Sequence, residues 1–255
     1  MINKQHLFKN LSQEQTLLQR VTQKNTTSPF SFSLALHTQE TKEEIIKNRE
    51  NIEKEFPNMY FIVANQTHSA NIQIITKQKE LGWKHEETAI KECDALITQE
   101  ENIMLTILTA DCVPILLFDP IQKVVAVVHA GWRGTEKKIL LKTVKKMQKK
   151  FNSKSNDIIV GIAPAIGRCC YEVDWNVAKN FENTPNAYSP KNNKYMLDLP
   201  YINKLQLLQA GLKEKNIEMS NICTACQVDS YFSYRKEQGC SGRFMSMLGL
   251  KSTSN

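Results

Sequence analysis

The stretch from Val124 to Thr135, VVAVVHAGWRGT, constrains the fold of this chain more than any other. Five consecutive apolar residues predict a buried strand, and the glycine-framed loop and Lys-rich segment that follow predict a turn and a helix. His129 stands at the end of this strand, where functional side chains are often placed. We interpret Thr135 as the N-cap of the helix, with Arg133 beside its free N–H groups, an arrangement typical of anion sites.

The flanking sequence predicts further strands and helices without a linker between them. We expect strands at 30–36, 60–64, 72–75, 94–98, 103–108, 113–118, 124–128 and 157–162, helices at 11–20, 41–56, 136–151, 175–181 and 199–212, and loops at 77–92 and 183–195. The strands at 113–118 and 124–128 read as a hairpin. The predicted fold is α+β (mixed α/β), one domain over 1–255 with mixed sheet layers flanked by helices.

The composition places some limits on where the protein works. The sequence has no apolar run of membrane-spanning length and no apolar segment near its start, MINKQHLFKN, so we expect neither a membrane span nor a secretory signal. Seven Cys, an odd number, then favour reduced thiols and a cytoplasmic location. The net charge of +7 comes with no recognition helix or basic-aromatic pattern, so no nucleic-acid partner is expected.

His68, Cys112 and His129 each follow a predicted apolar strand. Two imidazoles and a thiolate suit Zn²⁺ and leave a fourth position for water, which an open zinc site activates near neutral pH. The spacing alone leaves two alternatives: polar residues and a core thiol without metal, or Cys112 as a nucleophile with His129 as its base. Asp111 either orients a ligand, acts as an acid or base, or closes a turn.

Arginine is scarce and unevenly placed. Of 33 Lys and Arg residues only six are Arg, and four of these lie in short Gly-containing segments: Arg133, Arg168, Arg235 and Arg243. The planar guanidinium groups of these residues suit phosphate or a ribose-bearing ligand, because each can donate two parallel hydrogen bonds. Ordinary salt bridges within the loops are the alternative. Arg133 is the best candidate because of the predicted helix start.

Cys223 and Cys226 form a C-x-x-C pair, which is half of a zinc knuckle or a redox pair. Cys169 with Cys170, or else Cys240, would complete a metal site. Simple packing of buried thiols is the alternative.

Six motifs in order carry a resemblance to one family: NQTHSANI (65–72), DALIT (94–98), LTADCVPILLFDP (108–120), VVHAGWRGT (127–135), GIAPAIGRCCYEV (161–173) and FSYRKEQGCSGRFMS (232–246). The chain resembles the family long labelled multicopper polyphenol oxidases or laccase-domain proteins. Characterised members of that family are purine nucleoside phosphorylases that also deaminate adenosine.

The resemblance implies a mixed α/β domain and one Zn²⁺ held by His68, Cys112 and His129. It implies phosphorolysis of purine nucleosides, including methylthioadenosine, with inorganic phosphate, and hydrolytic deamination of adenosine. We expect Cys112, Asp111 and Arg133 to serve catalysis, and Arg133 and Arg243 to bind substrate. A copper-dependent phenol oxidase using the same three ligands is the alternative, although five His in total cannot supply sites for several coppers.

Overall fold

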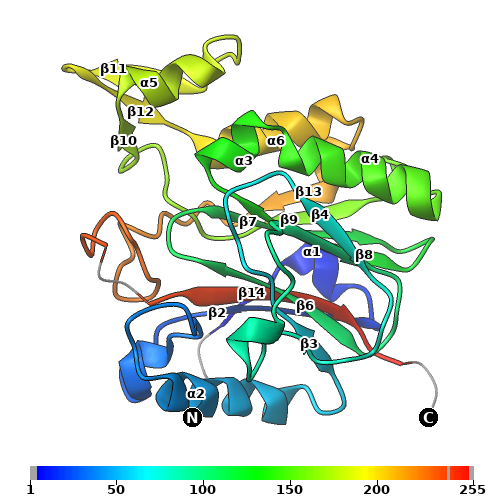
Figure 1. Cartoon of the computed structure of the whole chain (residues 1–255). Helices are drawn as coiled ribbons and strands as arrows, with labels where there is room; N and C mark the ends of the chain where they lie inside the picture. Colours follow the sequence, from blue (N-terminus) through cyan, green and yellow to red (C-terminus); the bar gives the residue numbers. More distant parts are fainter. Residues whose placement is uncertain (1–4, 240–241, 253–255) are drawn as a thin grey trace.

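Two β-sheets packed face to face form the centre of the molecule, with helices on both outer faces (Figure 1). A computed structural model describes residues 5–239 and 242–252. It confirms the predicted fold class, a mixed α/β domain with layered sheets flanked by helices. The extension of that domain over all of 1–255 stays a prediction.

The first sheet has five strands in the order β1-β2-β14-β6-β3. They are β1 (Gln5–His6), β2 (Leu17–Thr22), β14 (Phe244–Leu250), β6 (Ile103–Thr109) and β3 (Tyr60–Ile62). The late strand β14 pairs antiparallel with both β2 and β6, and β3 pairs parallel with β6. Segments far apart in the sequence therefore share this sheet.

The second sheet has six strands in the order β13-β9-β7-β8-β5-β4. They are β13 (Ile217–Met219), β9 (Ile159–Ile162), β7 (Val113–Asp119), β8 (Val124–Ala130), β5 (Ala95–Thr98) and β4 (Ile72–Ile75). The predicted hairpin is confirmed, because β7 and β8 pair antiparallel along their whole length. A small third sheet, β10 (Glu172–Val173), β12 (Lys194–Leu197) and β11 (Tyr188–Lys191), projects from the body at the upper left of Figure 1.

The helices cover the outer faces of the two large sheets. On the six-stranded sheet lie α3 (Trp132–Glu136), α4 (Ile139–Phe151) and α6 (Leu199–Gln209), and under the five-stranded sheet lies α2 (Lys42–Glu55) (Figure 1). The shorter helices are α1 (Lys9–Ser12), α5 (Trp175–Ala178) and the 3-10 turns η1 (Pro29–Phe32), η2 (Glu86–Thr88), η3 (Lys179–Phe181) and η4 (Glu214–Asn216). No helix in the described ranges is long and apolar enough to cross a membrane.

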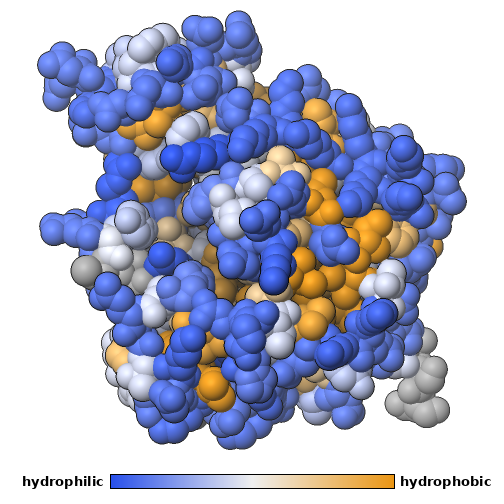
Figure 2. All heavy atoms as spheres, viewed as in Figure 1, coloured by the Kyte–Doolittle hydropathy of each residue, from blue (hydrophilic) through white to orange (hydrophobic). Residues whose placement is uncertain are grey.

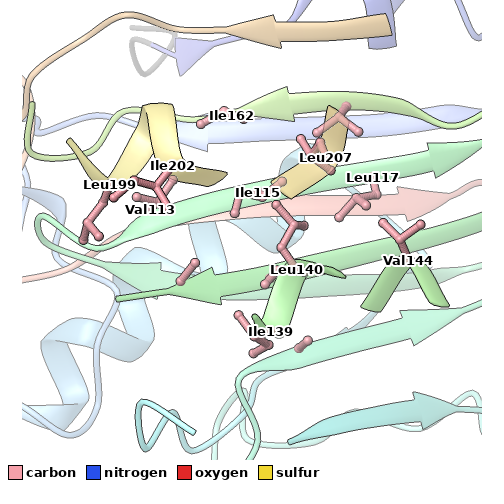
Figure 3. Close-up of a cluster of buried hydrophobic side chains, with 14 of the residues drawn as sticks. Val113, Ile115, Leu117, Ile139, Leu140, Val144, Ile162, Leu199, Ile202 and Leu207 are labelled. Carbon is pink, nitrogen blue, oxygen red and sulfur yellow. The ribbon is translucent and has the colours of Figure 1, made fainter. Parts of the chain in front are cut away.

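Alternating side chains of β7 supply two separate cores. Ile115 and Leu117 point to α4, where they join Leu140 in the cluster shown in Figure 3. Leu116 and Phe118 point the other way, into the core between the two sheets. Both faces of the strand are therefore buried, which explains its unbroken apolar run. Figure 2 shows that hydrophilic residues cover most of one face of the molecule, while hydrophobic ones gather around β4 and β8.

Two predictions for the N-terminal part are wrong. Residues 11–20, expected to be a helix, contain the end of α1 and much of β2, because pairing with β14 outweighs local helical preference. Residues 30–36, expected to be a strand, contain η1 with Phe30 and Ser31 in the left-handed region. The carbonyls of this segment are bound by α2: Asn48 donates to the carbonyl of Ser33, and Arg49 donates to that of Leu34.

Two more predictions fail near the functional regions. Residues 183–195 were expected to be a loop, but β11 and β12 pair as a hairpin over residues 188–197, with Tyr188 and Tyr195 packed edge to face. Thr135 is not an N-cap, because α3 begins earlier, at Trp132, and α4 begins after a break at Lys138, whose φ is 58°. Buried Thr135 accepts a hydrogen bond from Asn203 instead.

Candidate active site

The three predicted metal ligands lie together where the two large sheets meet. Cys112 lies in the short crossover between β6 of one sheet and β7 of the other. His129 on β8 is paired with Pro114, two residues beyond Cys112. His68 follows β3, the parallel neighbour of β6, and its φ of 58° lies in the left-handed region. The strand order thus brings three separate loops and strand ends to one point.

The ligand atoms of His68, Cys112 and His129 all lie within 4.8 Å of one another. Cys112 Sγ is 3.8 Å from His68 Nε2, and the two imidazole rings meet edge to face with centroids 4.9 Å apart. His129 is buried, Cys112 is half-buried and His68 is the most exposed of the three. The cluster is therefore enclosed by protein at His129 and accessible at His68.

Asp94 positions both histidines and was not among the residues predicted from the sequence. One carboxylate oxygen of this buried residue accepts hydrogen bonds from His129 Nδ1 at 2.7 Å and from the His68 backbone N–H at 3.0 Å. The other accepts from the backbone N–H and the hydroxyl of Ser69, at 2.7 and 2.6 Å. This carboxylate leaves His129 Nε2 free to act as a ligand. The available signal was an acidic residue opening the apolar DALIT strand.

The charges of the cluster stabilise a thiolate. Burial alone raises the pKa of Asp94, but hydrogen bonds from His129 and Ser69 outweigh it and lower the pKa to about 2. Burial likewise raises the pKa of Cys112, but the charge of His129 and hydrogen bonds from both histidines bring it below the usual thiol range. Because the thiolate is the form that binds metals, this environment suits a metal ligand.

Gly131 provides the space in which the ligands meet. A Cβ atom at this position would lie 2.9 Å from His68 Cδ2 and 3.0 Å from Cys112 Sγ, closer than van der Waals contact allows. The φ of Gly131 is −71°, which any residue adopts, so space is the reason for glycine here.

Asp111 joins three loops beside the cluster. Its carboxylate accepts a hydrogen bond from Thr224 Oγ1 at 2.6 Å and another from the Arg235 backbone N–H at 2.7 Å. Its carbonyl accepts from the Ile166 N–H at 2.9 Å. Its φ of 89° lies in the left-handed region. Both carboxylate oxygens are therefore already engaged by the protein.

A cavity of about 620 Å³ opens over the cluster, a volume typical of small-molecule sites. All the residues predicted to form the site line it: His68, Asp111, Cys112, His129, Arg133 and Arg243. Arg235 lines it as well, whereas Arg168 lines a separate pocket. Of the four arginines singled out in the sequence, three face this cavity.

The arginines of the cavity differ in their surroundings. The guanidinium of Arg133 lies over the ring of Trp132, 4.5 Å from its centroid. Arg243 lies 5.8 Å from the ring centroid of Tyr234, and burial lowers its pKa. Arg235 donates to the carbonyl of Glu172 and lies over Tyr171. They place three cationic side chains around the cavity, alongside the carboxylates of Glu86 and Asp111, and cationic groups in a cleft favour an anion.

Several further side chains of the cavity were missed, among them His37, Tyr171 and Tyr234. Both tyrosines lie inside motifs quoted above, GIAPAIGRCCYEV and FSYRKEQGCSGRFMS, but nothing in their spacing distinguishes them from core aromatics. Only the meeting of these loops at the cavity identifies them.

The chain is similar to known proteins over most of its length. The model of a family described as multi-copper polyphenol oxidoreductase laccase matches residues 18–251. The chain belongs to this family. The resemblance seen in the six motifs is thereby confirmed, and the match spans every residue of the site described above.

Members of the laccase-type family with similar sequences carry enzyme names. A purine nucleoside phosphorylase of Bacillus subtilis (strain 168), YlmD, is 35% identical over 232 residues, covering 88% of this chain and 84% of the relative. An adenosine deaminase from an unknown prokaryotic organism is 34% identical over 189 residues, 71% of this chain and 72% of the relative. The expectation of an enzyme of this type is supported by both.

A solved structure of the family has the same fold. The crystal structure of YlmD from Geobacillus stearothermophilus aligns with a TM-score of 0.90 at 31% identity, covering 98% of this chain and 99% of that one. The layered sheets and the crossover that carries Cys112 therefore belong to a fold already known in the laccase-type family.

Proposed function

We propose that this protein is a zinc-dependent purine nucleoside phosphorylase that also accepts methylthioadenosine and deaminates adenosine. The observation that carries the proposal is the His68–Cys112–His129 cluster at the floor of a cavity lined by arginines. The names of the relatives from Bacillus subtilis and the unknown prokaryote support it. A cytoplasmic location is part of the same proposal, since the site depends on a reduced thiol.

The donor set fits zinc. Two imidazoles and one thiolate are common zinc ligands, and three protein ligands leave one position open. The hydrogen bond from His129 to Asp94 is the carboxylate–histidine pair found behind metal-binding imidazoles. The space beside Gly131 fits ligands that converge, because a Cβ there would separate them. A zinc ion bound here would supply Lewis acidity toward a water molecule or a substrate oxygen.

The arginines would hold the phosphate. In phosphorolysis a phosphate oxygen forms a bond to the ribose C1′, the bond from C1′ to the purine N9 breaks, and N9 takes up a proton. Arg133 and Arg243 would bind the other phosphate oxygens through their planar forks. Tyr171 and Tyr234 line the same cavity and offer aromatic surface to the purine.

Asp111 would act as a positioning residue for the loops of the site. Its two carboxylate oxygens already accept hydrogen bonds from Thr224 and Arg235. In this role it fixes the segment that carries Cys112 against the loop that carries Arg235. The proton transfers of the reaction would then fall to groups that face the open cavity and do not bind the metal.

An assay with purified protein tests the proposal. Adenosine is incubated with and without phosphate, the products are separated, and bound metal is quantified in the same sample. We expect adenine and ribose 1-phosphate only with phosphate, and inosine without it. Cys112→Ala should abolish turnover, whereas Cys93→Ala, which changes a buried thiol outside the site, should keep it. Absence of nucleoside turnover by zinc-loaded protein, or phenol oxidation by protein of verified copper content, would contradict the proposal.

A further inference from the structure

Four cysteines from two loops meet outside the cavity described above. Cys169 and Cys170 lie in the loop after β9, and Cys223 and Cys226 lie in the loop after β13. All four Sγ atoms lie within 4.8 Å of one another. Cys226 Sγ is 3.5 Å from Cys169 Sγ and 3.4 Å from Cys170 Sγ. The C-x-x-C pair is thus completed by the vicinal pair, while Cys240, the other candidate, lies outside the described residues.

The spacing of the sulfurs suits a single metal ion. Zinc binds thiolates at about 2.3 Å in a tetrahedron, which places neighbouring sulfurs about 3.8 Å apart. The observed separations lie close to that value. A cluster of several iron atoms would need its sulfur ligands further apart than this arrangement allows. A disulfide of Cys226 with either neighbour would require sulfurs at about 2.05 Å and would leave two thiols without a partner.

The backbone around the sulfurs is built to bring them together. The Gly167 N–H donates a hydrogen bond to Cys223 Sγ at 3.3 Å, as backbone amides do to metal-bound thiolates. A Cβ at Gly167 would lie 3.2 Å from Cys223 Cβ and 3.4 Å from Cys169 Sγ, so glycine lets the two loops approach. Thr224 donates its N–H to the carbonyl of Ala165, which locks one loop to the other.

We propose that Cys169, Cys170, Cys223 and Cys226 bind a second, structural Zn²⁺, each thiol losing its proton on binding. The redox-inert ion closes a tetrahedral site of four sulfurs. This site fixes the wall of the catalytic cavity, because Tyr171 follows Cys170 directly and Thr224, next to Cys223, is hydrogen-bonded to Asp111. The proposal goes beyond the reaction and does not depend on which substrate is used.

Metal counting tests the proposal. Protein purified under reducing conditions and passed over a weak chelator should contain two zinc ions per chain. Cys226→Ser should contain one, and Cys112→Ala should contain one. The matched control is Cys93→Ser, which alters a buried cysteine outside both clusters and should keep two. One zinc per chain in the unaltered protein, lost entirely in Cys112→Ala, would overturn the proposal.

Cobalt substitution separates this test from a folding defect and from the proposed function. Co²⁺ added to metal-free Cys112→Ala should give the intense sulfur-to-metal absorption of a four-thiolate tetrahedral site, and Cys112→Ala/Cys226→Ser should lack it while keeping its far-ultraviolet circular dichroism. No such absorption in Cys112→Ala, or a Cys226 disulfide in freshly reduced protein, would refute the site. If nucleosides are not turned over but two zinc ions are found, the proposed function fails and this inference stands.

Discussion

Asp94→Asn is the substitution that most directly tests how the site is organised. The asparagine keeps the shape of the side chain but replaces one acceptor oxygen by an N–H₂ group. In one orientation of the amide, that group faces the His129 and His68 N–H groups; in the other it faces the N–H and hydroxyl of Ser69, of which only the hydroxyl can turn to accept. At least one backbone donor is therefore left unpaired, and the remaining hydrogen bonds go to a neutral amide in place of a charged, fully buried carboxylate.

The magnitude follows from these contacts. Hydrogen bonds to a charged group contribute about 1.5 kcal/mol each or more, so the free energy of unfolding of the metal-free protein should fall by about 3 kcal/mol. Loss of a carboxylate behind a metal-binding histidine typically weakens metal affinity by about 10- to 100-fold. Both effects should appear in the same variant, because the same carboxylate supports the fold and His129.

The assay combines urea unfolding, followed by circular dichroism, with zinc competition against a chelator. Competition is measured in the Cys226→Ser background, so that the four-cysteine cluster does not contribute. Asp119→Asn is the matched control: this buried carboxylate accepts from the N–H groups of Ile121 and Gln122 in the β7–β8 turn, and an asparagine oxygen can do the same. We expect a loss below about 1 kcal/mol and unchanged zinc affinity in the control. Zinc binding by Asp94→Asn as tight as in the parent would refute the reasoning.

Three further predictions concern the same region. Gly131→Ala should weaken zinc binding about tenfold or more, because the new Cβ displaces His68 or Cys112; chelator competition measures this, and unchanged affinity would contradict it. Arg243→Gln should raise the KM for phosphate about 10-fold while changing phosphate-independent deamination less, and an unchanged KM in steady-state kinetics would exclude Arg243 as a phosphate ligand. In acid, the lowered pKa of Asp94 gives stability that is full above its unfolded pKa near 3.8 and is lost as the pH falls through about 2. The free energy of unfolding of the metal-free protein, measured by urea titration, should therefore fall between pH 4 and pH 2 by about 2 kcal/mol more than that of Asp94→Asn, whereas parallel curves would contradict this.

Local pattern in the sequence was enough to predict the centre of the six-stranded sheet. The apolar runs at 113–118 and 124–128 and the Asp119-Pro120 turn between them predict an antiparallel hairpin, and β7 and β8 form it. Because hairpin register depends on a few neighbouring residues, the placement of Cys112 and His129 at the same end followed directly. The amphipathic helix at 41–56 could be predicted for the same reason, since α2 buries Ile45 and Ile52 on one face.

The family resemblance decided between the readings of the site that the spacing of its residues left open. His68 had already been grouped with Cys112 and His129, because each follows a predicted apolar strand, but the spacing left readings without metal open, and only the order of the six motifs favoured the metal site. The choice between a metal site and a thiol nucleophile rested on the same resemblance, because two imidazoles and a thiol serve either chemistry.

The partners of these residues were decided by tertiary structure alone. Asp94 reaches His129 because β5 and β8 are neighbours in the second sheet, and Asp111 reaches Thr224 and Arg235 because loops more than a hundred residues apart converge there. The four-cysteine cluster likewise forms only when the loops after β9 and β13 meet. Side-chain periodicity and turn chemistry are local and can be seen in a sequence, whereas contacts such as these depend on the order of strands in a sheet, which non-local packing determines.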